Sequence, residues 1–158
     1  FHYSFEDLKG KKGTLVILMC NHCPFVIHVL PEILMISSDY KVQGIGIISI
    51  SSNDVEKYPQ DNPEMMSEFA FKHSFDFPYL YDESQEVAKS FDAACTPDFY
   101  LFDSQDKLFY RGQLDDSRPG NGIPLSGSDL RNAIDALVYN RSLPELQKPS
   151  LGCNIKWK

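Results

Sequence analysis

Two cysteines stand where a buried strand is expected to give way to a helix. Residues 20–24 read Cys-Asn-His-Cys-Pro and follow directly on an apolar run at residues 15–19. Two thiols at this spacing can close a small disulfide ring, and the unpaired N–H groups of a helix start favour a thiolate. The motif therefore predicts dithiol–disulfide chemistry at a strand–helix junction. The alternative is two buried structural cysteines that happen to share this spacing.

The position of each thiol suggests a division of roles. Cys20 would lie at the junction itself, and Cys23 one turn further in. In such a geometry the outer cysteine is expected to be the more exposed and more acidic thiol, so we expect Cys20 to be the nucleophile and Cys23 the resolving thiol. A cationic ring at His22 would favour the Cys20 thiolate and make the disulfide more oxidising.

The rest of the chain alternates strand-like and helix-like segments, which predicts an α/β fold with a central mixed β-sheet and helices on both faces. We expect one domain over residues 1–140 and a tail over residues 141–158 that packs on it or extends from it. Apolar runs predict strands at residues 14–19, 44–50, 78–81, 98–102 and 107–111. Helical spacing predicts helices at residues 23–39, 84–91 and 130–138, and another that begins at residue 62.

The composition limits the classes of partner that this chain is expected to bind. The chain of 158 residues has a net charge of −7 and scattered basic residues, which argues against nucleic-acid or anionic-membrane surfaces. No apolar stretch reaches the length of a membrane span. Four cysteines are too few for a disulfide-stapled scaffold, and this usage favours a reducing cytoplasm. Because the chain begins at Phe1 rather than Met, an upstream export signal stays open, as does the oligomeric state.

A second candidate feature lies far downstream, at Cys95-Thr96-Pro97. A proline before an aromatic strand, separated in this way from the dithiol, is where a cis-proline loop would face the two sulfurs. The backbone of Thr96 would then be free to pair with an extended substrate. The alternative is an ordinary proline at the start of a strand.

With these residues the sequence resembles the thioredoxin superfamily, and within it the peroxiredoxin-like, or redoxin, branch. The stretches that carry the resemblance are residues 19–26, 95–99, 110–120 and 152–158. The resemblance implies a thioredoxin-like fold, an active dithiol at Cys20 and Cys23, and a cis peptide bond before Pro97. It leaves the substrate open.

Two departures from related families affect the activity. Peroxiredoxins place Thr or Ser three residues before the peroxidatic cysteine and a proline four residues before that. If Cys23 is aligned with the peroxidatic cysteine, Cys20 occupies the position of the Thr or Ser, and the proline is missing. Arg111 is a candidate for the guanidinium of such a site, or else a solvated charge at a strand end. Between the cysteines, Asn21-His22 replaces the Gly-Pro of thioredoxins, which predicts a less reducing potential.

We therefore expect a thiol–disulfide oxidoreductase that needs no metal or organic cofactor, acts on protein or small-molecule disulfides and draws electrons from an external thiol reductant. A thiol peroxidase is the first alternative. A non-catalytic module that binds a metal or a partner is the second, although zinc sites usually need a further ligand pair. Cys95 is either a third redox thiol or a small buried hydrophobe. Cys153 could resolve or pair elsewhere, but a free thiol is the plainer expectation. The charged loop of Asp115, Asp116 and Arg118 is expected to be solvated, with a place at the rim of the site as the alternative.

Overall fold

The computed structural model describes residues 2–158, so only the first residue of the predicted domain lies outside it. Strand β1 (Gly13–Leu18) forms the centre of a five-stranded sheet with the order β3-β2-β1-β5-β6. It pairs in parallel with β2 (Ile45–Ser51), which pairs in parallel with β3 (Tyr79–Tyr81). On its other side β1 pairs antiparallel with β5 (Asp98–Asp103), and β5 with β6 (Leu108–Gly112). The predicted mixed α/β sheet is confirmed.

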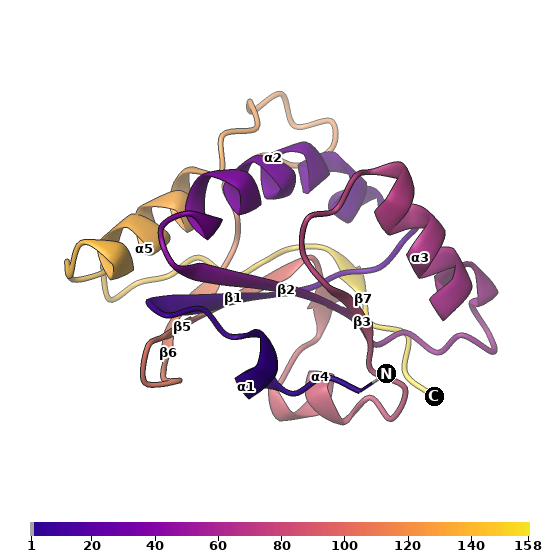
Figure 1. Ribbon diagram of the computed structural model, residues 1–158. Coiled ribbons are helices and arrows are strands. Elements are labelled where there is room, and N and C mark those ends of the chain that lie inside the picture. The colour runs from indigo at the N-terminus through magenta and orange to yellow at the C-terminus, as the bar shows by residue number, and fades with distance from the viewer. Residues whose placement is uncertain (1) are drawn as a thin grey trace.

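Helices cover both faces of this sheet. In Figure 1, α2 (Pro24–Lys41), α3 (Pro63–Lys72) and α5 (Ser128–Val138) lie on one side, and the short helices α1 (Phe5–Leu8) and α4 (Glu86–Ser90) on the other. A 3-10 turn, η1 (Pro59–Asp61), precedes α3. Among the described helices none is both long and apolar enough to cross a membrane.

The central strand is buried on both sides because its alternate side chains enter two separate cores. Leu15 and Ile17 pack under α2 and α5, in the larger cluster. Val16 and Leu18 point the other way and pack with Ala88 of α4. A strand covered on both faces is expected to have a continuous apolar sequence rather than an alternating one. The apolar run at residues 15–18 therefore predicts a buried strand.

The C-terminal tail adds a small second sheet that the sequence did not indicate. Strand β7 (Cys153–Asn154) pairs antiparallel with β4 (Cys95–Thr96), the two residues before Pro97. The next residue, Ile155, is buried with Val16, Leu18 and Tyr100 on the α4 side of the main sheet. The end of the chain is therefore built into the molecule beside the predicted cis-proline loop.

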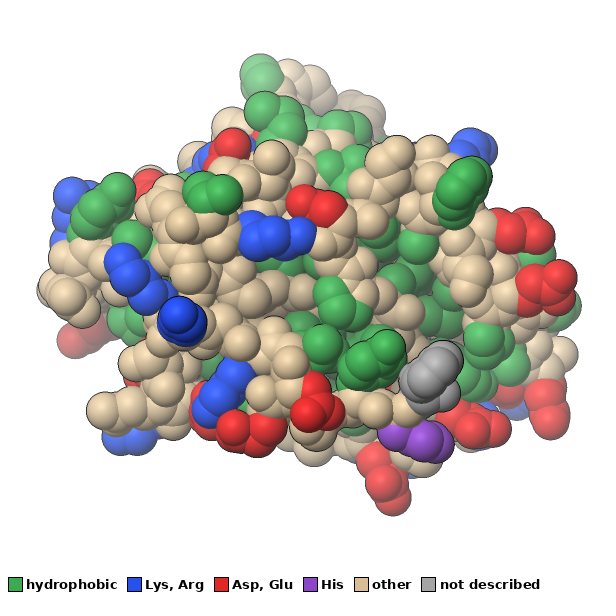
Figure 2. Space-filling model, viewed as in Figure 1, with side chains coloured by type: hydrophobic (Ala, Val, Ile, Leu, Met, Phe, Trp, Pro, Cys, Tyr) green, Lys and Arg blue, Asp and Glu red, His purple; other side chains and the backbone are tan. Residues whose placement is uncertain are grey.

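Basic and acidic side chains both occur on the face shown in Figure 2, where no continuous basic patch is visible. The loops at the carboxyl ends of β1 and β2 lie next to each other because the two strands run in parallel. This arrangement brings residues after Leu18 and after Ser51 to one edge of the sheet, where the predicted dithiol lies.

Candidate functional site

The two cysteines of the motif lie at the junction between β1 and α2, as predicted. Cys20 follows the strand by two residues, and Cys23 is the N-cap of α2, with Pro24 in the first turn. A proline at this position costs the helix no hydrogen bond, because the first N–H groups of a helix have no intrahelical partner. Cys23 therefore sits at the positive end of an 18-residue helix, where a thiolate is favoured.

Thr96 contacts the sulfur atoms of both Cys20 and Cys23. Its hydroxyl Oγ1 is 3.8 Å from Cys20 Sγ, and its carbonyl oxygen is 3.6 Å from Cys23 Sγ. The Thr96–Pro97 peptide bond is cis. The structure thus brings together four of the predicted site residues, although more than seventy positions separate the cysteines from Thr96 in the sequence.

The structure corrects the expected state of Cys153. This residue is not a free thiol but forms a disulfide with Cys23, with 6.3 Å between the two Cα atoms. Cys20 and Cys95 are the cysteines without a disulfide. The motif spacing identifies two cysteines that are close in sequence. It cannot identify a partner such as Cys153, which is 130 residues from Cys23.

The expected exposure and acidity of Cys20 are also wrong. Cys20 and Cys23 are both only 1% exposed, so neither is an outer thiol. Burial raises the pKa of Cys20, and the nearby carboxylate of Asp61 raises it further. The Thr96 hydroxyl and the backbone N–H groups of His22 and Cys23 act in the opposite direction without cancelling the effect.

His22 is directed to a buried acid that the sequence analysis missed. Its Nδ1 lies 2.9 Å from Asp61 Oδ1, which also accepts a hydrogen bond from the backbone N–H of Asn21. Asn53 donates to the other Asp61 oxygen. Asp61 is fully buried in η1, and the Pro59-Gln60-Asp61 sequence gave no sign of this position. The His22 ring is thus held by the buried carboxyl group of Asp61 rather than lying free beside Cys20.

Cys20, His22 and Asp61 are also the group that could hold a metal ion, since one ligand atom from each lies within 4.8 Å of the others. Sulfur, imidazole and carboxylate are ligands that suit zinc. However, Asp61 already accepts hydrogen bonds from Asn21 and Asn53 and contacts His22. A metal ion would have to displace part of this network.

Arg111 and Cys95 line one pocket together with Asp98. Arg111 donates to the carbonyl of Asp92, contacts Asp98 at 3.4 Å and stacks over the Tyr100 ring. Cys95 Sγ is 3.8 Å from the carbonyl oxygen of Ser150. Burial, followed by the charge of Asp98, raises the pKa of Cys95 to about 11, which describes an unreactive thiol.

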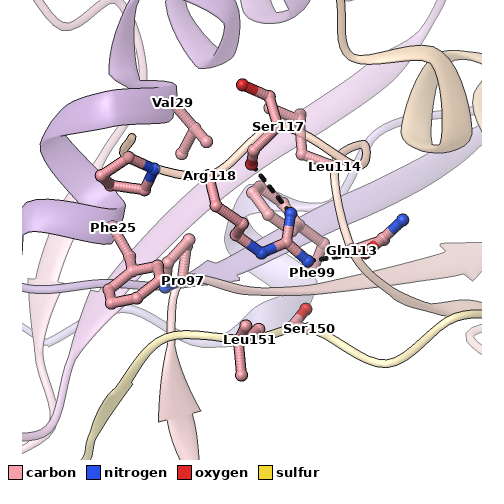
Figure 3. Close-up of a pocket in the computed structure, with 11 residues that line it drawn as sticks. Phe25, Val29, Pro97, Phe99, Gln113, Leu114, Ser117, Arg118, Ser150 and Leu151 are labelled. Atoms are coloured by element: carbon pink, nitrogen blue, oxygen red, sulfur yellow. Dashed lines mark hydrogen bonds between the residues drawn. The ribbon is translucent and has the colours of Figure 1, made fainter. Parts of the chain in front are cut away.

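A pocket lies beside Pro97 and is also lined by Phe25 and Arg118 (Figure 3). Arg118 reaches across it from the loop after β6 and donates to Gln113 Oε1 at 2.6 Å. Phe25 and Pro97 form the wall nearest to the start of α2. Asp115 departs from the predicted solvated loop, because it is 2% exposed and accepts from the backbone N–H groups of Ser126 and Gly127. Asp116 is exposed as predicted, and Arg118 lines the pocket.

Comparison with known proteins places this geometry in a family. Redoxin is the family whose model matches, over residues 2–133. An uncharacterized conserved protein from Geobacillus kaustophilus is 56% identical, with a TM-score of 0.94 over 97% of this chain and 81% of that one. A hypothetical protein from Sinorhizobium meliloti is 41% identical, with a TM-score of 0.96 over 99% and 85% of the two chains. No curated protein gave a significant match.

More distant structures share the fold alone. A thioredoxin-like protein solved in its oxidized form is 18% identical, with a TM-score of 0.68 over 90% of this chain and 88% of that one. A secreted disulfide oxidoreductase from Mycobacterium tuberculosis is 13% identical, with a TM-score of 0.63 over 85% and 87% of the two chains. The fold is therefore thioredoxin-like, and the chain belongs to the Redoxin family.

Proposed function

We propose that the protein is a thiol–disulfide oxidoreductase that works through Cys20 and Cys23. The observation that carries the proposal is the shared contact with Thr96, which holds both sulfurs beside the residue that precedes Pro97. The family and the thioredoxin-like fold support a redox role of this general kind.

The reaction needs only the two thiols and an external disulfide. The thiolate of one cysteine attacks a substrate sulfur, the substrate S–S bond breaks, and one substrate thiol leaves with a proton. The second cysteine then attacks the mixed disulfide, which forms the Cys20–Cys23 bond and releases the other substrate thiol. Two thiols are oxidised and one disulfide is reduced, and an external thiol reductant restores the pair.

In this proposal Cys23 makes the first attack and is the sulfur that becomes bonded to the substrate. Its place at the helix N-terminus stabilises a thiolate, whereas burial and Asp61 disfavour ionisation of Cys20. Each cysteine is nevertheless required, because removal of either leaves a mixed disulfide that cannot be resolved within the pair.

The test is reduction of insulin disulfides with dithiothreitol as electron donor, followed by turbidity. We expect Cys20→Ser and Cys23→Ser each to lower the rate above background by about a hundredfold. Leu146→Ala, which changes a side chain that is 87% exposed in the tail, serves as the control and should keep the rate within twofold. Retention of the full rate by both cysteine variants would remove the proposal.

A further inference from the structure

The segment around Cys153 is fixed against the site on both sides of the cysteine. Upstream, Ser150 Oγ donates to the carbonyl of Gly112 at 2.7 Å. Downstream, the N–H of Ile155 donates to the carbonyl of Ala94, and the Ile155 side chain is 4% exposed. Further along, the carbonyl of Lys156 accepts from the N–H of Asp54 at 2.7 Å. These contacts hold Cys153 in place independently of its disulfide.

Three cysteines meet at Thr96. Cys20 contacts its hydroxyl, Cys23 contacts its carbonyl oxygen, and Cys153 is its partner in the β4–β7 register. One of these cysteines is a thiol and the other two form a disulfide. A thiol close to a disulfide is the arrangement in which exchange occurs, through attack of the thiolate on one of the two bonded sulfurs.

We propose that Cys153 is a third redox cysteine, which exchanges its bond to Cys23 with Cys20 while β7 keeps it at the site; this inference rests on the proposed function of the Cys20–Cys23 pair. In the step, Cys20 gives its proton to solvent and its thiolate attacks Cys23 Sγ. The Cys20–Cys23 bond forms, the Cys23–Cys153 bond breaks, and Cys153 leaves as a thiolate that takes up a proton. One thiol and one disulfide are present before and after, so no other oxidant or reductant is consumed.

The strand pairing gives this exchange two consequences. Because Cys153 is anchored on both sides, it stays next to Cys23 after the bond breaks and can attack it again in the reverse step. Because β7 occupies the edge of β4, the backbone of Thr96 that was expected to bind an extended substrate is already paired with this chain. The internal cysteine therefore occupies the position that an external thiol would take.

The experiment identifies which cysteine besides Cys95 is a free thiol in protein that carries one disulfide. Oxidised protein is held at pH 8 without external thiol, trapped with N-ethylmaleimide in denaturant and digested for mass spectrometry. We expect wild type to show label on both Cys20 and Cys153, because the two disulfides interconvert. Cys20→Ser should retain only the Cys23–Cys153 disulfide, and Cys153→Ser only the Cys20–Cys23 disulfide.

A steric variant tests the role of β7 while leaving every cysteine in place. A Cβ atom at Gly152 would overlap the carbonyl oxygen of Thr96, so Gly152→Ala must push β7 away from β4. We expect the ratio of Cys23–Cys153 to Cys20–Cys23 disulfide to fall at least tenfold. Leu146→Ala is the matched control within the tail and should leave the ratio within twofold of wild type.

The outcomes separate this inference from the proposed function. Cys95 is labelled in either form. Wild type labelled otherwise only on Cys20, or only on Cys153, would show that the two disulfides do not interconvert and would overturn the inference. An unchanged ratio in folded Gly152→Ala would overturn the role of β7. Either result can coexist with full loss of insulin reduction in Cys20→Ser and Cys23→Ser. If those variants keep that activity, it is the proposed function that fails.

Discussion

Thr96 uses two different groups to contact two sulfurs, and this is the most specific chemical detail of the site. The hydroxyl faces Cys20 and the backbone carbonyl faces Cys23. A hydroxyl that donates to sulfur stabilises the thiolate, and this contact lowers the otherwise raised pKa of Cys20. The side chain of Thr96 therefore acts on Cys20 alone, which makes it separable from the backbone contact.

Thr96→Val removes the hydroxyl and keeps the shape of the side chain. We expect the pKa of Cys20 to rise further and its reaction at pH 7 to slow about fivefold, the equivalent of roughly 1 kcal/mol for one hydrogen bond. The measurement is thiolate absorbance at 240 nm against pH, in protein whose other three cysteines are serine. Thr96→Ser keeps a donor and should restore most of the wild-type pKa. An identical titration curve for Val and Thr would show that the hydroxyl donates elsewhere.

At the scale of elements, helix α3 shows how much local sequence can specify. Asn62 caps the helix by accepting from the N–H of Met65 at 2.9 Å, and Pro63 takes the first helical position. Both residues are favoured there for physical reasons that act within one turn. This is why residues 62–64 predicted the start of α3 correctly without any knowledge of the fold.

Asn62→Ala should lower the free energy of unfolding by about 1 kcal/mol, because one N–H group at the start of α3 loses its side-chain acceptor. Urea denaturation followed by circular dichroism measures the change. Asn62→Asp supplies an equivalent acceptor and should stay within a few tenths of a kcal/mol of wild type. Equal destabilisation by Ala and Asp would mean that the amide nitrogen of Asn62, rather than its oxygen, stabilises the helix start.

The elements that sequence could not predict depend on contacts between distant residues. The apolar runs of β1 and β2 and the periodic faces of α2 and α5 were identified because each carries its own pattern. Strand β7 has only two residues, and its pairing with β4 joins positions more than fifty residues apart. The disulfide of Cys23 and the burial of Asp61 follow from such distant contacts, so neither was visible in the motif around Cys20.

At the scale of the whole molecule, the Cys23–Cys153 bond ties the first third of the chain to its end. It closes a loop with a sequence separation of 130. In the chain-entropy model, closing a loop of this size lowers the conformational entropy of the unfolded state. This stabilises the folded protein by roughly 5 kcal/mol. If Cys20 takes over the bond to Cys23, this long loop is replaced by a very short one. The proposed exchange would therefore change stability as well as chemistry.

The buried phenols and thiols make the folded molecule sensitive to alkaline pH. Burial raises the pKa of Tyr40 to about 12 and that of Cys95 to about 11, and it also raises the pKa values of Tyr100 and Tyr110. In each group the folded state holds its proton more tightly than the unfolded chain does. The resulting stability is complete below the ordinary pKa of the group and is lost as pH rises toward the folded value.

We therefore expect the urea midpoint of reduced protein to be level between pH 7 and 8 and to fall steadily from about pH 9 to 11. Tyr40 offers a direct check, because its hydroxyl donates to Asp135 at 2.8 Å and ionisation would place two negative charges together. Tyr40→Phe loses this hydrogen bond and should start less stable at pH 7. Its decline between pH 10 and 11 should nevertheless be shallower, since one group that titrates differently in the two states is gone. Parallel curves for the two proteins over that range would show that Tyr40 keeps an ordinary pKa in the folded state.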